Sequence, residues 1–317
     1  MPRSQRILLI GSTGQVGWEL VRSLRSLGEL THTSTKPSGE LGVRDALALD
    51  LADGDAIRAM VRDANPTIIV NAAAYTAVDK AEQEPELAAK VNAVAPGVLA
   101  EEARRVGAAL VHYSTDYVFD GSGTRPWREN DPVAPLGEYG RTKLAGEEAI
   151  RAAGAAHLIL RTSWVYGVRG NNFVRTMLRF ARERAELRVV SDQVGAPTSA
   201  RCLCDVTCLA LAQVLRDPAE MLAERGGVFH VACGGETSWH AFAEEIFRQA
   251  RSMGMNLAVE RVTPITTAEY HTPARRPLNS RLDRAKLREA FGLCPPDWST
   301  ALAETLPLLA RHNFSWS

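Results

Sequence analysis

An apolar run leads directly into a glycine-rich turn in the stretch Ile7-Leu8-Leu9-Ile10-Gly11-Ser12-Thr13-Gly14-Gln15-Val16-Gly17. Glycines allow positive φ angles and a close approach of the backbone to a ligand, and a following helix offers free N–H groups to a pyrophosphate. The spacing G-x-x-G-x-x-G differs from the G-x-G-x-x-G fingerprint, but its place between a first strand and a first helix suits a dinucleotide. We predict a cofactor loop formed by Gly11, Thr13, Gly14, Gln15, Val16 and Gly17; an ordinary tight turn is the alternative.

Short apolar runs alternate with helical patterns through the first half of the chain, and runs such as Ile68-Ile69-Val70 are typical of parallel strands buried on both faces. This alternation predicts an α/β fold with a doubly wound parallel sheet, the Rossmann architecture. The expected strands are Arg6–Ile10, Leu30–Thr33, Leu47–Leu51, Thr67–Asn71, Ala109–Ser114 and Leu158–Thr162. The expected helices are Gln15–Leu27, Asp53–Asp63, Glu84–Val106 and Gly140–Ala153.

The alternation breaks after Val165, which predicts a smaller α/β substrate lobe built from late insertions. The elements expected there are helix Asn172–Arg184, strand Leu187–Val190, the cysteine-containing helix Ala200–Leu215, strand Val228–Ala232, helix Ser238–Met253 with Ser238 as its N-cap, and helices near Arg284–Phe291 and Ser299–Ala310. We expect residues 1–166 to form a dinucleotide-binding domain, with 196–236 returning to it. Residues 167–195 and 237–317 would form the substrate-binding lobe.

Composition and charge argue against several classes of protein. The 317 residues are 45% apolar and 23% charged, and 37 acidic residues balance 37 basic ones, so nothing predicts a nucleic-acid or anionic-membrane partner. No apolar run is long enough to span a bilayer, and the N-terminus does not resemble a secretion signal. The five cysteines lack a zinc-binding spacing, and their odd number predicts free thiols in the cytoplasm.

Three further segments are candidates for the cofactor site. Thr33-Ser34-Thr35-Lys36 follows the second strand and contains no acid, so Ser34 and Lys36 favour the 2′-phosphate of NADPH, with NADH as the alternative. Asp50 and Leu51 follow the third strand, where the adenine would lie. Ala72, Ala73 and Ala74 are small enough for the cofactor to pass close to the backbone, and close helix–sheet packing can hold at the same time.

A hydroxyl-rich strand end and a tyrosine–lysine pair complete the pattern of a reducing site. Hydride addition to a ketone needs a proton donor and a group that polarises the carbonyl. Tyr139 and Lys143 lie one helical turn apart, so the lysine charge would lower the tyrosine pKa from about 10 toward neutrality. Thr115 would hold the carbonyl oxygen from the other side. A packed tyrosine and a solvated lysine are the better interpretation of an isolated pair, but the order of these segments predicts a nicotinamide-dependent carbonyl reductase.

Later segments carry a family resemblance. They are Asn71–Asp79, Ser114–Phe119, Tyr139–Glu147, Arg161–Tyr166, Asn171–Phe173, Asp192–Thr198 and Pro273–Pro277. With them the chain resembles the extended short-chain dehydrogenases/reductases, and more closely the dTDP-4-dehydrorhamnose reductase family. The resemblance implies a catalytic triad of Thr115, Tyr139 and Lys143, with Tyr139 as the proton donor. It also implies a substrate site formed by Thr76, Val78, Thr115, Asp116, Tyr139, Trp164, Asn172, Gln193, Arg275 and Arg276.

The reaction implied by the resemblance is the NADPH-dependent reduction of the 4-keto group of dTDP-4-dehydro-β-L-rhamnose to dTDP-β-L-rhamnose. The guanidinium groups of Arg275 and Arg276 match diphosphate oxygens, with a surface arginine pair as the alternative. Trp164 would pack on the hexose, with simple core packing as the alternative. A reductase of another dTDP-4-keto-6-deoxysugar is the first rival function. A non-catalytic, dinucleotide-binding regulatory subunit is the second.

The resemblance also raises the question of a metal, because some members of that family dimerise through a magnesium ion bound by carboxylates. Glu19 matches one ligand position, but Arg201 and Leu308 stand where the other acids are expected. A cation beside a cation site is repulsive, so the sequence argues against magnesium. It leaves a monomer and a homodimer equally open.

Overall fold

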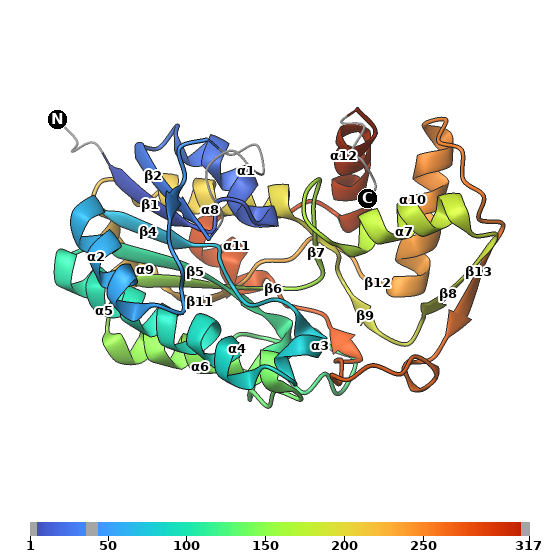
Figure 1. Cartoon of the computed structure of the whole chain (residues 1–317), viewed down its shortest axis with the longest axis horizontal. Coiled ribbons are helices and arrows are strands. Elements are labelled where there is room, and N and C mark those ends of the chain that lie inside the picture. The colour runs from blue at the N-terminus through green and yellow to red at the C-terminus, as the bar shows by residue number, and fades with distance from the viewer. Residues whose placement is uncertain (1–4, 36–43, 312–317) are drawn as a thin grey trace.

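Seven strands form the central sheet, in the order β3-β2-β1-β4-β5-β6-β11 (Figure 1). The computed structural model describes residues 5–35 and 44–311. Neighbouring strands of this sheet are all parallel, and the order reverses its direction between β1 and β4, as in dinucleotide-binding folds. The predicted doubly wound Rossmann fold is therefore confirmed.

The helices and strands have the following bounds. The central strands are β1 (Arg6–Ile10), β2 (Glu29–Ser34), β3 (Leu47–Ala48), β4 (Ile68–Asn71), β5 (Ala109–Thr115), β6 (His157–Thr162) and β11 (Gly227–His230). The helices associated with them are α1 (Gln15–Leu24), α2 (Gly54–Ala64), α3 (Val78–Ala81), α4 (Pro85–Ala89), α5 (Ala95–Val106), α6 (Glu138–Ala153), α8 (Ala200–Ala212), α9 (Pro218–Arg225) and α11 (Ala285–Phe291). The other elements are β7 (Val165–Tyr166), α7 (Phe173–Glu183), β8 (Glu186–Val190), β9 (Val194–Gly195), β10 (Thr198–Ser199), β12 (Thr237–Ser238), α10 (Trp239–Ser252), β13 (Arg261–Ile265), β14 (Asn279–Ser280) and α12 (Trp298–Arg311).

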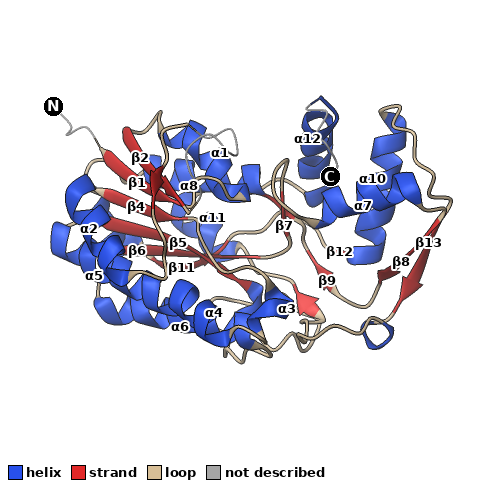
Figure 2. Cartoon of the chain, viewed as in Figure 1, coloured by secondary structure: helices blue, strands red, loops and turns tan. Residues whose placement is uncertain are grey.

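Helices cover both faces of the central sheet and enclose an apolar core on each (Figure 2). On one face, α1 and α8 pack together, and Leu20 and Leu203 are fully buried. On the other face, α2, α5 and α6 bury Ile57, Leu99 and Ile150. Each fully buried side chain of this size contributes about 1.5–3 kcal/mol, so the apolar stripes determine which side of each helix faces the sheet.

The prediction of one continuous helix over Glu84–Val106 is wrong in the middle of that range. A π-helical turn, η1 (Lys90–Val94), separates α4 from α5. Pro96 has no N–H to donate to the carbonyl of Asn92, four residues earlier, so the regular helix cannot continue there. The freed Asn92 oxygen faces α6, where a Cβ on Gly146 would lie only 2.1 Å from it. The π turn thus brings two helices close together beside the site.

The predicted strand Leu47–Leu51 is also shorter than expected, because β3 ends at Ala48. The carboxylate of Asp50 accepts a hydrogen bond from the backbone N–H of Ala52 at 2.9 Å. This local bond turns the chain toward α2, which begins after the N-cap residue Asp53. Asp50 and Leu51 therefore follow the sheet edge instead of extending it.

A second apolar core lies beyond the sheet, in the part of Figure 1 that contains α7, α10 and the paired strands β8 and β13. Its centre contains Phe242, Ile246 and Leu302, all fully buried. Ser238 caps α10 as predicted, since its side chain accepts the N–H of Ala241. The proposed domain boundaries stay a prediction. Leu287 of α11 lies in the range assigned to the substrate-binding lobe, but its side chain packs into the core of the central sheet.

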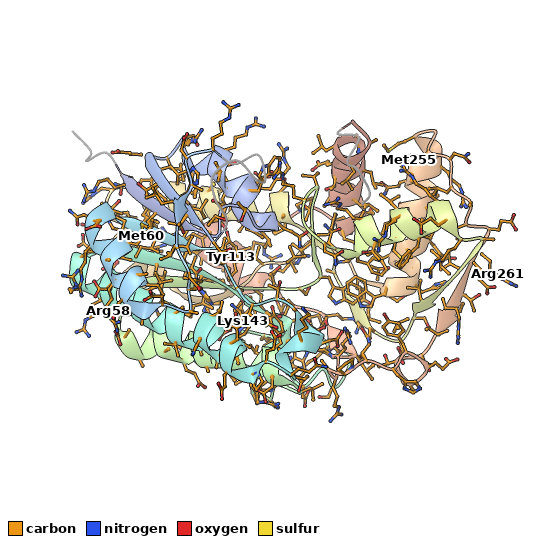
Figure 3. The ribbon with its side chains drawn as sticks, viewed as in Figure 1. Arg58, Met60, Tyr113, Lys143, Met255 and Arg261 are labelled. Atoms are coloured by element: carbon orange, nitrogen blue, oxygen red, sulfur yellow. The ribbon has the colours of Figure 1, made fainter. Side chains whose placement is uncertain are left out.

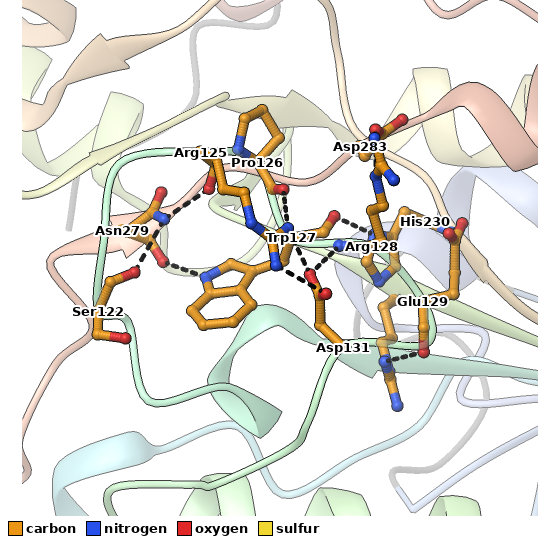
Figure 4. Close-up of polar contacts among 11 residues, drawn as sticks. Ser122, Arg125, Pro126, Trp127, Arg128, Glu129, Asp131, His230, Asn279 and Asp283 are labelled. Atoms are coloured by element: carbon orange, nitrogen blue, oxygen red, sulfur yellow. Dashed lines mark hydrogen bonds and ion pairs between the residues drawn. The ribbon is translucent and has the colours of Figure 1, made fainter.

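The chain segment that follows the β5 end is tied to distant parts of the sequence (Figure 4). The side-chain amide of Asn279 donates to the carbonyl oxygens of Ser122 and Arg125, and the Trp127 indole N–H donates to the Asn279 carbonyl. The backbone N–H of His230 donates to the Glu129 carboxylate at 2.9 Å. These bonds link β14 and β11 to one loop beside the site. None of the described helices is long and apolar enough to cross a membrane.

Candidate active site

A cavity of about 690 Å³ opens at the carboxyl ends of the central strands, where ligands bind in doubly wound sheets. It runs from the glycine-rich turn, past the strand ends, to the second lobe. Among the residues predicted for the site, those that line it are Gly11, Thr13, Gly14, Gln15, Val16, Ser34, Asp50, Leu51, Ala72, Ala73, Ala74, Thr76, Val78, Thr115, Asp116, Tyr139, Lys143 and Trp164. One continuous cavity therefore brings together segments that are far apart in the sequence.

The glycine-rich turn has the close backbone contacts that its sequence suggests. Gly11 has a φ of 85°, and a Cβ there would lie 2.8 Å from the Ala73 backbone nitrogen. Gly17 does not line the cavity; its missing Cβ would lie 2.0 Å from the Gly11 carbonyl oxygen. Gly14 is the N-cap of α1 and has no side chain that could accept a hydrogen bond. The first N–H groups of the helix therefore face the cavity without a side-chain capping bond. This arrangement fits a dinucleotide pyrophosphate.

The end of β2 meets the same turn. The Thr13 and Ser34 hydroxyls lie 2.9 Å apart, and Thr33 and Thr35 also line the cavity. Lys36, the cation predicted to favour NADPH, lies outside the described residues. The hydroxyl-rich edge is thus in place beside the loop, and the role of Lys36 stays a prediction.

Tyr139 lies in the first turn of α6, and a close contact fixes where that helix begins. A Cβ on Gly140 would lie 2.3 Å from the Tyr117 carbonyl oxygen, so glycine lets α6 approach the strand end. The Tyr117 ring packs edge-on against the Tyr139 ring, with 5.4 Å between centroids. Burial raises the pKa of Tyr139 to about 12, while the neighbouring Thr115 hydroxyl opposes the shift. Without cofactor, the tyrosine therefore carries its proton.

Lys143 lies deeper than a solvated lysine would, with only 1% of its surface exposed. Its Nζ donates to the Tyr113 carbonyl at 2.6 Å and lies 3.1 Å from His112 Nε2. Lys143 and Tyr113 are labelled in Figure 3. Burial lowers the pKa of Lys143 to about 8, and Glu147 one turn further along α6 opposes this. The expected effect of Lys143 on the Tyr139 pKa stays a prediction for the cofactor-bound protein.

Thr115 and Asp116 end β5 inside the cavity. The Thr115 hydroxyl donates to Asp116 Oδ1 at 3.1 Å and accepts the Tyr117 N–H at 3.2 Å. Asp116 is 2% exposed, and burial raises the pKa of its carboxyl to about 6. A buried carboxyl that lines a cavity is typical of a site that binds hydroxyl groups of a ligand.

The far end of the cavity is formed by Trp164, whose backbone has a φ of 52°. A bulky residue rarely adopts this conformation, which costs roughly 1–3 kcal/mol and needs support from its surroundings. The Trp164 ring stacks on the Trp239 ring with 3.6 Å between centroids. A Cβ on Gly195 would lie 3.0 Å from the Trp164 ring. The indole is therefore held rigidly with one part of its surface in the cavity.

Four residues predicted to bind substrate do not line this cavity. The Asn172 side chain caps α7 and donates to Gln15 Oε1 at 3.0 Å, which places its neighbour Asn171 in the lining instead. Gln193 accepts from the Trp239 indole at 3.1 Å and so supports the stacked tryptophans. Arg276 forms a 2.8 Å ion pair with Asp79 of α3, while Arg275 is exposed. Their contacts with substrate stay predictions.

The sequence did not point to two buried residues behind the site. Asn92, in the π turn, donates to the Tyr75 carbonyl, accepts the Tyr75 N–H and contacts the Thr142 hydroxyl at 3.3 Å. His112 bridges Lys143 and Asn71 from inside the sheet. Strand alternation could have pointed to His112, because it shares a face of β5 with Ser114.

A second cavity lies against α1 and contains the residues considered for magnesium. Glu19, Arg201 and Leu308 all line it, together with Arg22 and Arg25. Burial raises the pKa of Glu19, and Arg201 opposes that shift. Among the described residues, no group of three or more His, Cys, Asp or Glu side chains is placed to hold a metal ion.

The chain is similar over almost its whole length to proteins of one family. The family model for the RmlD substrate binding domain matches residues 5–310. A dTDP-4-dehydrorhamnose reductase from Escherichia coli strain K12 is 47% identical over 300 residues, which cover 95% of this chain and 96% of the relative. The corresponding enzyme from Burkholderia thailandensis is also 47% identical, over 94% of this chain and 96% of the relative.

Solved structures give the same result. The dTDP-4-dehydrorhamnose reductase of Clostridium acetobutylicum superposes with a TM-score of 0.84 at 38% identity, covering 96% of this chain and 99% of that one. The Bacillus anthracis enzyme, solved in complex with NADP, has a TM-score of 0.84 at 33% identity with the same coverage. The chain therefore belongs to the dTDP-4-dehydrorhamnose reductase family of extended short-chain dehydrogenases/reductases.

Proposed function

We propose that this chain catalyses the NADPH-dependent reduction of the 4-keto group of dTDP-4-dehydro-β-L-rhamnose to dTDP-β-L-rhamnose. The observation that carries the proposal is the single cavity that joins the glycine-rich turn to Thr115, Tyr139 and Trp164. The curated relatives bear the name of this reaction, and one structural relative was solved with NADP. An NAD(P)H-dependent oxidoreductase is the assignment that agrees with both.

The cofactor site is proposed from the backbone geometry at the start of α1. Gly11, Gly14 and the free N–H groups of the first helical turn would bind the pyrophosphate. Thr13 and Ser34, whose hydroxyls already contact one another, would face the adenine ribose. Bound NADPH would supply the hydride that reaches C4 of the sugar.

The proton is proposed to come from Tyr139, whose raised pKa keeps the hydroxyl protonated in the free protein. Thr115 would turn its one hydroxyl hydrogen from Asp116 to the carbonyl oxygen and so stabilise the charge that develops there. Asp116 would accept a hydrogen bond from a sugar hydroxyl, and Trp164 would pack against the apolar face of the hexose.

The nucleotide end of the substrate is proposed to lie near Arg276. Arg276 forms an ion pair with Asp79, the residue that follows the cavity-lining Val78 in the sequence. A guanidinium can bind one oxygen acceptor while its other N–H groups remain paired. A dTDP diphosphate would thus find a positioned cation at the rim.

The deciding experiment mixes purified protein with NADPH and dTDP-4-dehydrorhamnose, made from dTDP-glucose by the two preceding enzymes. We expect loss of NADPH absorbance with dTDP-rhamnose as the product. NADPH binding without oxidation would contradict the proposal and favour a different dTDP-4-keto-6-deoxysugar. Co-purification of a stoichiometric partner, with no ketone reduced, would favour a regulatory subunit.

A further inference from the structure

Three buried side chains form a hydrogen-bonded chain from β4 to α6, on the side of Lys143 that faces the sheet. Asn71 Nδ2 lies 3.1 Å from His112 Nδ1, and His112 Nε2 lies 3.1 Å from Lys143 Nζ. Each of the three residues is only 1% exposed. The proposed reaction uses Lys143 but assigns no task to Asn71 or His112.

The amide of Asn71 is oriented by its own backbone. Its Oδ1 accepts the N–H of Ala73 at 3.2 Å, so its Nδ2 is the atom that faces His112. An amide nitrogen only donates, and His112 Nδ1 must therefore accept. Burial alone, the largest cause, holds the pKa of His112 well below its ordinary value, so the imidazole is neutral. A neutral imidazole that accepts at Nδ1 carries its hydrogen on Nε2.

Burial alone lowers the pKa of Lys143 to about 8, and the hydrogen on Nε2 sets a further requirement for this side chain. An ammonium group has three donors and no lone pair, so it cannot accept a hydrogen bond. An uncharged amine has one lone pair for the Nε2–H and two N–H groups, one of which can donate to the Tyr113 carbonyl at 2.6 Å. We propose that Asn71 and His112 are positioning residues that hold Lys143 as an uncharged amine in the protein without cofactor.

The other charged groups near Lys143 do not remove this requirement. Glu147, on the same helix, is engaged by Arg161 of β6 and by the Ser114 hydroxyl of β5. Tyr139, one turn earlier on α6, is neutral, as is His112 on β5. Asp116 lies at the end of β5 and has a pKa that burial raises to about 6, but among the described residues it forms no ion pair with Lys143. The carboxylate on the helix of Lys143 is already paired with an arginine.

This state has a consequence for the cofactor-bound protein, which rests on the proposed role of Lys143 in the reaction. When Nζ takes a proton from solvent water, it loses the lone pair that accepts the Nε2–H. The ammonium is then released from His112 and is attracted to the cavity, where dinucleotide oxygens would lie. Protonation of Lys143 is therefore coupled to its movement toward the cofactor.

The tautomer of His112 can be measured by ¹⁵N NMR on the full chain labelled with [¹⁵N]histidine, without cofactor and then with NADPH. The signals of His112 are identified by their loss in His112→Gln. Without cofactor we expect a protonated Nε2 and an unprotonated Nδ1. A hydrogen on Nδ1, or an imidazolium, would overturn the proposal. Because this result does not depend on turnover, its failure is distinct from failure of the proposed reaction.

A substitution can reverse the tautomer. In Asn71→Asp the carboxylate only accepts, so Nδ1 takes the hydrogen and Nε2 accepts from a charged Lys143. We expect the ¹⁵N pattern of His112 to invert in the protein without cofactor.

Asn279→Asp is the matched control, because Asn279 is also buried, with 2% exposed, and does not line the cavity. It should leave the ¹⁵N pattern of His112 unchanged. An unchanged ¹⁵N pattern in folded Asn71→Asp would refute the proposal, and if that variant does not fold, the tautomer of the natural chain decides.

Discussion

Arg161 and Glu147 form an ion pair in the interior behind the candidate active site, with 2.7 Å between Arg161 Nη2 and Glu147 Oε2. The two side chains are 3% and 0% exposed, and the Ser114 hydroxyl also donates to Glu147. The pair joins β6 to the helix that carries Tyr139 and Lys143. It therefore fixes the distance between the sheet and α6.

Replacement of Glu147 by Gln should destabilise the protein by about 3–5 kcal/mol, because Arg161 would remain as an uncompensated buried charge. Chemical denaturation, followed by circular dichroism, measures the loss. The matched control is Glu245→Gln, which breaks a pair with Arg248, a side chain that is 66% exposed. That change should cost at most about 1 kcal/mol. An equal loss of unfolding free energy in the two variants would show that burial of the Glu147–Arg161 pair does not increase its contribution to stability.

Tyr139→Phe should abolish turnover and leave NADPH binding almost unchanged. The substitution removes the hydroxyl that would donate the proton, but keeps the ring that packs edge-on against Tyr117. Steady-state kinetics measure the first effect and fluorescence titration with NADPH the second. Tyr117→Phe is a suitable control, since it removes a hydroxyl from the neighbouring ring. A Tyr139→Phe protein that retained kcat would rule out this proton donor.

The sequence indicated the parts of the fold that depend on local pattern. The glycine-rich turn, the apolar strands and the one-turn spacing of Tyr139 and Lys143 all lie within short windows, and the structure brings these segments to one cavity. The bridge from His112 to Lys143 depends on the packing of α6 against β5, which no short window contains. The π turn at Asn92 was hidden because Pro96 and Gly146 act on it together across two helices.

Arg276→Ala should raise the KM for the nucleotide sugar by roughly 10-fold or more with a smaller effect on kcat, because a charge-assisted hydrogen bond contributes about 1.5–3 kcal/mol. Arg275 is exposed, so Arg275→Ala is the matched control and should have the weaker effect. Asp79→Ala should resemble Arg276→Ala, since it removes the carboxylate that positions this guanidinium. A loss confined to kcat would place Arg276 elsewhere in the reaction.

Gly17→Ala and Gly14→Ala should separate folding from cofactor binding. A Cβ at Gly17 would lie 2.0 Å from the Gly11 carbonyl oxygen, so the backbone must move, at a cost of typically 1–3 kcal/mol. The nearest atom to a Cβ at Gly14 is 3.4 Å away, an ordinary contact, but Gly14 lines the cavity. We expect Gly17→Ala to lower Tm, and Gly14→Ala to keep Tm while weakening NADPH binding. The reverse pattern would argue against a cofactor at this turn.

Asp116 should make the stability of the protein depend on pH in an unusual direction. Its pKa is raised to about 6 in the folded protein, because burial disfavours the carboxylate. The folded state therefore binds the Asp116 proton more tightly than the unfolded state does, and the stability from this group is lost as the pH rises through about 6. Asp116→Asn should remove this loss and raise Tm at neutral pH by roughly 2–5 °C, at the expense of activity.

Asp120, four residues further along, is a control because its pKa is shifted in the opposite direction, so its effect on the pH dependence of stability has the opposite sign. A hydrogen bond from the backbone N–H of Ser122 lowers the pKa of its carboxyl, so Asp120 contributes stability that is lost as the pH falls. Asp120→Asn should therefore lower Tm at neutral pH and have little effect in acid. Thermal unfolding of both variants between about pH 4.5 and 8 measures the two slopes. If Asp116→Asn lowered Tm at neutral pH, the Asp116 carboxylate would be a stabilising charge, and its role as a strained, ligand-facing acid would be refuted.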